Sequence, residues 1–368
     1  MGEHALLRRT VGGNCQWGMV VGRTPGVGNI GGGICFLAPI PEARRGTGTG
    51  GEVMALLEVE NLSVSYLTDG SYVDAVRDVS FTVEKGDSLA IVGESGSGKT
   101  TLAMTLMGLL PVTARVTSGR VTFDGTDLLK LKEEELRRVR WRKMGMVFQA
   151  SQNALDPVRK VGQQLVELYR YHTKSTKEEA RGEVLRALES VNLDRSVANL
   201  YPHELSGGMK QRVVIAAAIL LDPKLLIADE PTTALDVVTQ AEILLLLKRV
   251  VRERELTLIF ITHDLNLVSV LCKRIMVMYG GTDMEQGTLE DVVASPSHPY
   301  TAHLLGTLEG LEEGKLVLGT HREVIKGGCP FYSRCPEAVD YCRVRFPDRR
   351  EIGPRSVRCL LRGGETRS

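Results

Sequence analysis

One stretch of eight residues constrains the fold of this chain more than any other. Residues 93–100 read Gly-Glu-Ser-Gly-Ser-Gly-Lys-Thr and match the pattern G-x-x-x-x-G-K-(S/T). The apolar run 88–92 before it is typical of a buried strand, and residues 101–107 after it suit a helix. A glycine-rich turn in this context lets backbone N–H groups point inward around phosphate oxygens at the positive end of the helix.

The pattern assigns candidate nucleotide ligands to this turn. Lys99 supplies a positive charge for the β- and γ-phosphates, and the Thr100 hydroxyl can ligate Mg²⁺. The other candidates lie beside them in the same stretch: Gly93, Glu94, Ser95, Gly96, Ser97, Gly98 and Thr101. The alternative is a glycine- and serine-rich turn without a ligand, and the strand and helix on either side argue against it.

The composition excludes several other classes of protein. The chain has 368 residues, 43% of them hydrophobic, so one large domain with appendages is expected. Lys and Arg together number 46 and Asp and Glu 45, and this balance gives no support for nucleic acid as a partner. No apolar run reaches the roughly 18 residues of a membrane span. Seven cysteines, unevenly placed, do not suit a secreted disulfide scaffold.

Residues 1–53 differ in composition from the rest of the chain. Fourteen of them are glycine, which resists a packed core because ordering glycine costs conformational entropy. They are either a flexible tail or sequence upstream of a true start at Met54. We favour the second interpretation because recognisable structure begins there.

Strand-like apolar runs alternate with helical patterns in the centre of the chain. This alternation predicts a largely parallel sheet with ligands at the carboxyl ends of its strands. The predicted strands are 56–66, as an edge strand, 73–83, 88–92, 143–149, 225–230 and 256–262. The predicted helical regions are a charged helix at 131–142, residues 150–200 with a capping box at 176–179, and the core helix 213–221.

Polar residues stand where these strands end. Asp229 suits an Mg²⁺ ligand, and Glu230 is placed to orient or deprotonate a water at the γ-phosphate. A charged strand end facing solvent is the alternative, but two acids directly after four apolar residues make it a poor one. Gln149 and His263 end or follow neighbouring strands, so we expect one nucleotide site at this edge of the sheet.

Two further features are ambiguous from the residues alone. Tyr66 ends the first predicted strand and either stacks on an adenine ring or is an ordinary strand-end aromatic. Ser206-Gly207-Gly208 precedes an apolar helix and is either an anion site or a plain N-cap.

The ordered series of motifs between residues 56 and 290 resembles the ATP-binding subunit of ABC transporters. The matching segments are 93–100 (Walker A), Gln149 (Q-loop), 205–212 (signature), 226–230 (Walker B), 234–236 (D-loop) and His263 (switch histidine). The resemblance implies that Glu230, His263 and Gln149 act in ATP hydrolysis and that Tyr66 stacks on adenine. It also implies that Gln149 joins Thr100 and Asp229 at Mg²⁺. In that family Ser206, Gly207 and Gly208 complete the ATP site of a second, head-to-tail ATPase subunit.

Finer features are similar to the dipeptide, oligopeptide or nickel importers of that family. They are residues 201–204, Met209, residues 297–301 and a cysteine-bearing tail. The resemblance implies an ATPase at the cytoplasmic face of the membrane that powers uptake. Its partners would be a second ATPase subunit (a copy or a paralogue), two transmembrane permease subunits and an extracytoplasmic solute-binding protein. One departure is that residues 280–286 lack the usual apolar strand residues, which puts the late strand in doubt.

Two other functions compete with this hypothesis. A soluble ABC-type ATPase of DNA repair or translation usually has tandem ATPase domains or long coiled-coil insertions, and this chain shows neither. A regulatory module that binds ATP without hydrolysis does not need the intact Glu230 and His263.

The predicted fold is α/β, an ABC-type P-loop ATPase with a mixed, mainly parallel sheet. The predicted organisation is a glycine-rich extension (1–53), the ATPase domain (54–290) with a helical subdomain at about 150–205, and a C-terminal extension (291–368) with four cysteines.

The four cysteines of the C-terminal extension are spaced C-x₅-C-x₆-C-x₁₆-C. They are Cys329, Cys335, Cys342 and Cys359. Four thiolates suit an iron–sulfur cluster or tetrahedral zinc equally by ligand softness, and four unligated thiols in a small folded tail are the plain alternative. The resemblance favours a four-iron, four-sulfur (4Fe–4S) cluster over zinc, because some dipeptide-importer ATPases hold one in such a tail.

Overall fold

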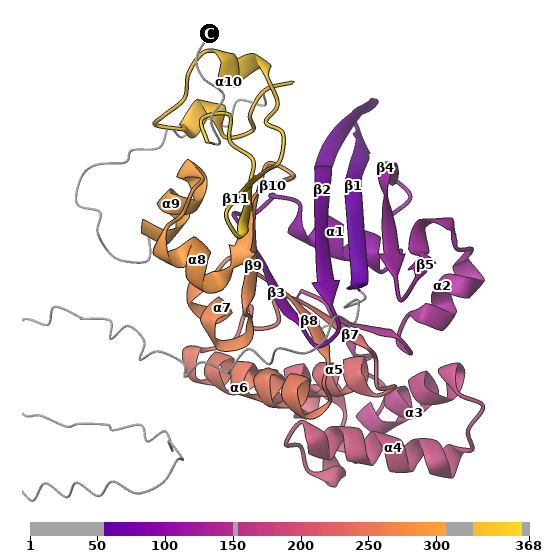
Figure 1. Ribbon diagram of the computed structural model, residues 1–368. Helices are drawn as coiled ribbons and strands as arrows, with labels where there is room; N and C mark the ends of the chain where they lie inside the picture. Colours follow the sequence, from indigo (N-terminus) through magenta and orange to yellow (C-terminus); the bar gives the residue numbers. More distant parts are fainter. Residues whose placement is uncertain (1–54, 150–153, 307–326, 363–368) are drawn as a thin grey trace, which may run out of the picture. The chain divides into compact units, whose positions relative to one another are not determined.

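Two β-sheets form the framework of the chain (Figure 1). The computed structural model describes residues 55–149, 154–306 and 327–362, all within one compact unit, Glu52–Ser368. The predicted glycine-rich extension, residues 1–53, lies outside the described residues.

The larger sheet has eight strands. In spatial order they are β11 (Arg350–Ile352), β12 (Arg355–Val357), β10 (Thr282–Thr288), β9 (Arg274–Tyr279), β3 (Ser88–Val92), β8 (Thr257–Thr262), β7 (Leu225–Asp229) and β6 (Met144–Val147). The run from β9 to β6 is parallel, and β10, β12 and β11 continue it in antiparallel pairing. The prediction of a mixed, mainly parallel sheet is confirmed.

The smaller sheet is antiparallel and has four strands. Its order is β2 (Ser71–Glu84), β1 (Ala55–Thr68), β4 (Ala114–Phe123) and β5 (Thr126–Asp127). The prediction that residues 56–66 form an edge strand was wrong, because β1 pairs with β2 on one side and β4 on the other. The polar residues of that strand, such as the exposed Glu60, reflect an open face of the sheet and not an open edge.

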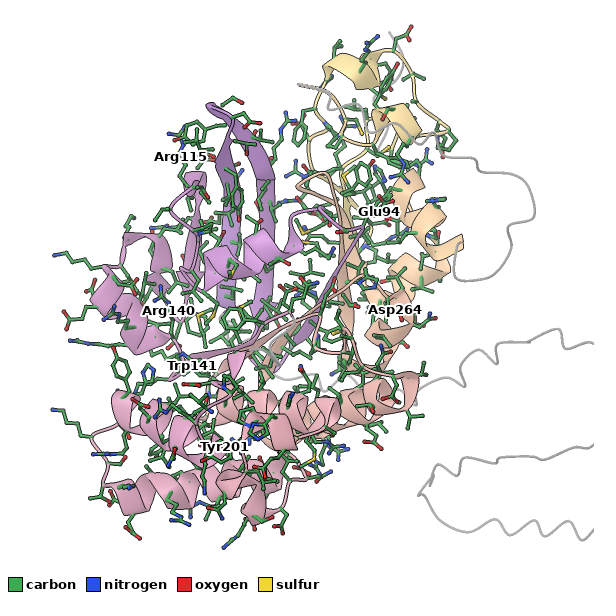
Figure 2. All side chains as sticks on the ribbon, turned by 180° about the vertical axis from the view of Figure 1, so that it is seen from behind. Glu94, Arg115, Arg140, Trp141, Tyr201 and Asp264 are labelled. Carbon is green, nitrogen blue, oxygen red and sulfur yellow. The ribbon has the colours of Figure 1, made fainter. Side chains whose placement is uncertain are left out.

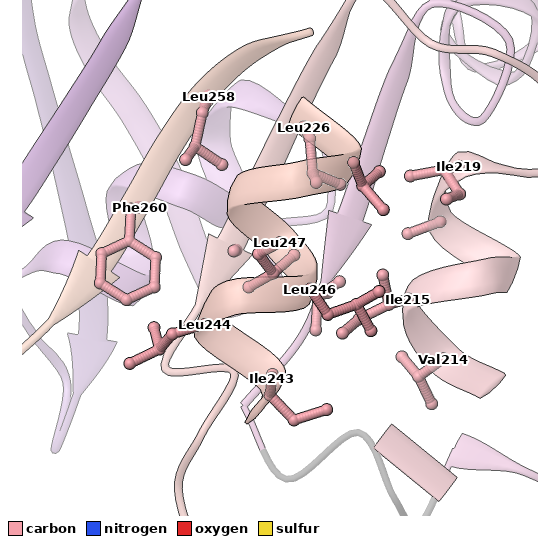
Figure 3. Packing of buried hydrophobic residues seen from close by; sticks show 14 of the residues in the cluster. Val214, Ile215, Ile219, Leu226, Ile243, Leu244, Leu246, Leu247, Leu258 and Phe260 are labelled. Atoms are coloured by element: carbon pink, nitrogen blue, oxygen red, sulfur yellow. The ribbon is translucent and has the colours of Figure 1, made fainter. Parts of the chain in front are cut away.

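The central strands are buried on both faces, and their alternate residues enter two different cores. Ala90 and Val92 of β3 belong to the core under α5 and α6, whereas Leu89 and Ile91 belong to the core shared with the smaller sheet. Figure 3 shows the first of these cores, where leucines of α6 pack beside Leu226 and Phe260 of the sheet. Burial of both faces explains why these strands are continuous apolar runs.

Ten α-helices complete the described part of the chain. They are α1 (Lys99–Leu106), α2 (Glu133–Val139), α3 (Val161–His172), α4 (Lys177–Ser190), α5 (Gly207–Ile219), α6 (Val237–Glu253), α7 (Leu265–Leu271), α8 (Leu289–Ala294), α9 (Pro299–Gly306) and α10 (Tyr341–Val344). The capping box predicted at Thr176 and Glu179 begins α4. Short 3₁₀ helices lie at Leu128–Lys130, Arg195–Asn199, Pro202–Glu204 and Tyr332–Arg334.

Helix α2 is shorter than the predicted helix at residues 131–142. It ends at Val139 because Arg140 leaves the helix and turns inward (Figure 2). The Arg140 guanidinium donates to the carbonyl oxygen of Met107 at 2.7 Å and to the Glu133 carboxylate at 2.8 Å.

The late strand that the sequence placed in doubt is present as β10. Its polar residues are buried because they hold the C-terminal segment. Asp283 accepts hydrogen bonds from Arg349 and Arg358, and Glu285 accepts from the backbone N–H groups of Ser297 and His298. Strand β12 pairs directly with β10, so the segment after residue 327 extends the main sheet (Figure 1).

Candidate nucleotide site

The P-loop joins β3 to α1 and has a shape that only glycine permits at two positions. Gly93 and Gly98 have φ angles of 153° and 98°. A Cβ atom on Gly93 would lie 2.1 Å from the carbonyl oxygen of Met278, and one on Gly98 would lie 2.3 Å from that of Ala75. The loop therefore packs closely on β9 and on β2, while Ser95 and Gly96 at its tip are exposed.

Lys99 is buried inside this loop, with only 6% of its surface exposed. Its ammonium group donates to the carbonyl oxygens of Gly93 at 2.8 Å and Glu94 at 2.9 Å, and to the Ser97 hydroxyl at 3.3 Å. Desolvation lowers the pKa of Lys99, and the charges of Glu230, Asp229 and Glu94 oppose that shift. All three hydrogen-bond partners of this buried group are neutral oxygens, an arrangement that suits an anion site.

Asp229 ends β7 and is 1% exposed. Neither of its carboxylate oxygens has a hydrogen-bond partner of normal geometry in the described structure. Burial raises the pKa of Asp229 to about 6, and the nearby Thr100 hydroxyl and Lys99 ammonium offset only part of that effect. A buried carboxylate with free oxygens beside a hydroxyl is a donor set that fits Mg²⁺.

Glu230 follows Asp229 and turns away from the strand with a φ angle of 46°. Three side chains converge on its carboxylate. His263 Nδ1 lies 3.0 Å from Oε1, and the Thr233 hydroxyl and Gln149 amide donate to Oε2 at 2.9 and 3.2 Å. Burial opposes ionisation, but the hydrogen bonds of His263 and Thr233 lower the pKa of Glu230 below its ordinary value. The structure therefore holds an ionised carboxylate at the ends of β6, β7 and β8.

Thr233 was not identified from the sequence. It comes three residues after Glu230, in a turn where its backbone N–H also donates to the carbonyl oxygen of Glu230. Only that i, i+3 spacing could have indicated it, and the spacing alone is not specific.

Tyr66 lies on the side of the site formed by the smaller sheet. Its hydroxyl is 3.4 Å from the hydroxyl of Thr101 in the first turn of α1. The structure thus brings the half-buried Tyr66 ring beside the start of the P-loop helix.

The signature residues begin α5, which packs against α4 and α6. The Ser206 hydroxyl accepts a hydrogen bond from the Met209 N–H at 3.2 Å and remains exposed. Gly208 lies so close to α6 that an added Cβ atom would stand 2.7 Å from the Thr239 methyl group. Ser206, Gly207 and Gly208 therefore form an open helix N-terminus on the helical part of the domain.

The four cysteines predicted to bind a metal are all free thiols in one small segment. Desolvation raises the pKa of Cys329 to about 12 and of Cys335 to about 11, and the charge of Cys359 adds to both shifts. The backbone N–H of Cys329 donates to the carbonyl oxygen of Cys342 at 2.8 Å. Among the described residues, however, no group of three or more His, Cys, Asp or Glu side chains is placed to hold a metal ion. The four side chains are therefore not gathered, in this structure, into a ligand set for the predicted cluster or for zinc.

The fold and site agree with comparisons to known proteins. Residues 76–233 match the family described as "ABC transporter". A dimeric structure of the ATP-binding cassette MJ0796, bound to ADP and Pi, is 31% identical with a TM-score of 0.57 over 63% of this chain and 98% of that one. The cbiO1 structure from Clostridium perfringens is 30% identical with a TM-score of 0.57 over 70% and 98%. The class is therefore the ABC-type ATP-binding protein.

The C-terminal region narrows this class. Residues 284–342 match the family described as "Oligopeptide/dipeptide transporter, C-terminal region". The oligopeptide transport ATP-binding protein OppD of Escherichia coli K12 is 43% identical over 84% of this chain and 93% of its own length. The dipeptide transport ATP-binding protein DppD of Bacillus subtilis is 45% identical over 79% and 90%. The chain belongs to the family of oligopeptide and dipeptide transport ATP-binding proteins. None of its described helices is long and apolar enough to cross a bilayer.

Proposed function

We propose that this chain hydrolyses ATP to power the uptake of di- or oligopeptides, or of nickel, through a membrane importer. The observation that carries the proposal is the environment of Glu230. Its carboxylate is ionised, oriented by Gln149, Thr233 and His263, and adjacent in sequence to the unpartnered Asp229. A carboxylate in such a setting can orient a water molecule and accept its proton.

Each residue has a distinct part in this reaction. Lys99 exchanges its carbonyl partners in the loop for phosphate oxygens, which are better partners because they are anionic. Thr100 and Asp229, with Gln149, would hold Mg²⁺, which when bound neutralises charge on the β- and γ-phosphates. Glu230 takes the proton of the attacking water, and His263 and Thr233 keep its carboxylate in position.

The proposal includes a dimer of ATPase subunits, a copy or a paralogue, on two transmembrane permeases at the cytoplasmic face. An extracytoplasmic solute-binding protein would deliver the solute. The exposed Ser206 at the start of α5 supports the dimer, because its helix N-terminus is open to the phosphates of a partner's ATP. The dimeric state of the similar MJ0796 structure supports it as well.

Nucleotide binding by the Lys99→Ala variant tests the site. We expect loss of useful ATP affinity, because the variant removes the buried cation of the loop. The measurement is titration of the full chain with a fluorescent ATP analogue, with Lys248→Ala on α6 as a control. Unchanged affinity in Lys99→Ala would contradict the proposed site.

We also propose a metal centre at Cys329, Cys335, Cys342 and Cys359, with a 4Fe–4S cluster preferred to zinc. Its support is that all four thiols are free and lie near one another: besides burial, the charges of Cys359, Cys335 and Cys342 raise the pKa of Cys329. Anaerobic purification should give a brown protein with iron and acid-labile sulfide. One zinc ion in a colourless protein would replace iron, and no metal, with Cys335→Ser behaving as wild type, would overturn both.

A further inference from the structure

We propose that Tyr300 and Arg334 are positioning residues of the nucleotide site, which fix the P-loop through Glu94. This inference rests on the proposed ATPase function and adds the C-terminal segment to its machinery. Tyr300 belongs to α9, and Arg334 to the short 3₁₀ helix Tyr332–Arg334 between two of the cysteines.

Glu94 is held at three points. Its backbone N–H donates to the Tyr300 hydroxyl at 3.1 Å, and its carboxylate accepts from Arg334 Nη1 at 2.8 Å. Its carbonyl oxygen accepts from Lys99 at 2.9 Å. Only the last contact is local, since Tyr300 and Arg334 follow Glu94 by 206 and 240 residues. Figure 2 shows Glu94 just below the C-terminal segment, which contributes Arg334.

The ion pair between Glu94 and Arg334 is shielded from water. The Arg334 side chain is 14% exposed and the Glu94 side chain 26% exposed. Arg334 Nη1 also donates to the Tyr279 hydroxyl at 3.3 Å. A shielded guanidinium with two partners in fixed directions restrains Glu94 more than an exposed ion pair would.

The groups that hold Glu94 are themselves packed as one unit. Phe331 is fully buried, and its ring lies 5.2 Å from the Tyr279 ring and 5.3 Å from the Tyr300 ring. The backbone N–H of Tyr300 donates to His298 Nδ1 at 3.0 Å. Burial lowers the pKa of His298 to about 3, so its ring is neutral and can accept this bond. The C-terminal segment therefore offers the P-loop a rigid support.

This support matters at the step in which Lys99 changes partners. Lys99 must leave the carbonyl oxygens of Gly93 and Glu94 when it pairs with phosphate. If Glu94 is fixed from outside the loop, the loop keeps its shape when that internal contact is lost. Without the support, ATP binding must also order the loop, which lowers affinity. Hydrolysis of bound ATP depends on Glu230 and should change little.

The test is nucleotide titration of the full-length chain with a fluorescent ATP analogue. We expect Arg334→Ala and Glu94→Gln each to weaken binding about 5- to 10-fold, and the double variant to be no weaker than either single one. Arg334→Lys should recover part of the affinity, because an ammonium can still pair with Glu94. Tyr300→Phe should also weaken binding, since it removes the acceptor for the Glu94 N–H.

The matched control is Arg362→Ala. Arg362 lies in the same segment and pairs with Glu337 and the Ser297 carbonyl, so its loss should leave ATP affinity unchanged. Thermal unfolding without nucleotide identifies any variant that does not fold, and Glu94→Gln keeps the test valid if Arg334→Ala is such a variant.

Two results would overturn the inference. One is wild-type affinity in folded Arg334→Ala, and the other is a double variant whose loss equals the product of the two single losses. Failure of the proposed function would look different, because Lys99→Ala would then keep its affinity for ATP.

Discussion

Two buried aspartates of the same sheet differ in their hydrogen-bond partners. Asp229 and Asp283 are each 1% exposed. Asp229 has no hydrogen-bond partner for either carboxylate oxygen in the described structure, whereas Asp283 accepts from Arg349 at 2.7 Å, Arg358 at 3.2 Å and Gln286 at 2.6 Å. Burial raises the pKa of both carboxyls, but only at Asp283 do two guanidinium groups oppose it.

The difference separates a ligand site from a structural joint. An unpartnered buried carboxylate destabilises the protein, and it is useful when a cation is to bind there. A carboxylate closed by two arginines leaves no position for a ligand, and instead joins β10 to the C-terminal segment. The segment that Asp283 fastens is the one whose Arg334 reaches the P-loop.

The largest expected effect is on the rate of ATP hydrolysis, at the nucleotide site that contains Asp229. Glu230→Gln should retain ATP binding but slow hydrolysis by about 10²–10⁴, the range for loss of a general base. The measurement is phosphate release by the assembled transporter. Glu253→Gln, at the exposed end of α6, is the control and should hydrolyse ATP normally. Near wild-type turnover in Glu230→Gln would show that another group accepts the proton.

Substitution of the structural aspartate, Asp283, should change the stability of the protein. Asp283→Asn leaves the Arg358 guanidinium, 3% exposed, with only the half-exposed Asp78 carboxylate as counter-charge, and should lower the free energy of unfolding by about 3 kcal/mol. Urea denaturation measures this loss. Asp348→Asn, at an exposed ion pair with Arg345, should change stability by less than about 0.5 kcal/mol. An equal, small effect in both variants would show that the buried pairs do not fasten the segment.

In the absence of nucleotide and Mg²⁺, Asp229→Asn should raise the free energy of unfolding, in contrast to Asp283→Asn. The pKa of Asp229 is about 6 in the folded state against 3.8 ordinarily, so the folded state binds more protons between these values. The carboxyl therefore causes the free energy of unfolding to fall as pH rises from about 4 to 6. Asp229→Asn removes this loss and should be more stable than wild type at pH 7.5, by up to about 3 kcal/mol.

The control for that prediction is the pH itself. Near pH 4 the Asp229 carboxyl is protonated in the folded wild type, so the advantage of Asp229→Asn should disappear. A variant less stable than wild type at pH 7.5 would mean that the carboxylate has a partner in the folded protein.

The last prediction is that one deletion has no effect on function. Removal of residues 1–53 should leave ATP binding and transport unchanged, because β1 begins at Ala55 and the site is built from residues after it. Transport by the truncated chain in the assembled importer is the measurement. Loss of assembly would show that the extension belongs to the working protein.

How far the sequence predicts this structure depends on the distance between the residues that interact. The P-loop, the strand ends and the α4 capping box are local patterns, and their backbone conformations follow from neighbouring residues. The arginine partners of Asp283 follow it by 66 and 75 residues. Because they are so far along the chain, the polar residues of β10 put this strand in doubt, although its buried carboxylate is paired. Tyr300 and Arg334 were missed for the same reason, and Thr233 because threonine in a turn is common.

The Mg²⁺ dependence of ATP binding tests the central comparison most directly. The full-length wild type, Asp229→Asn and Asp283→Asn are titrated with ATP in the presence and absence of Mg²⁺. We expect Mg²⁺ to strengthen ATP binding by wild type and by Asp283→Asn in the same ratio, and to have little effect on Asp229→Asn. If Asp229→Asn kept the wild-type ratio, the unpartnered carboxylate of β7 would not be the ligand of the nucleotide's metal.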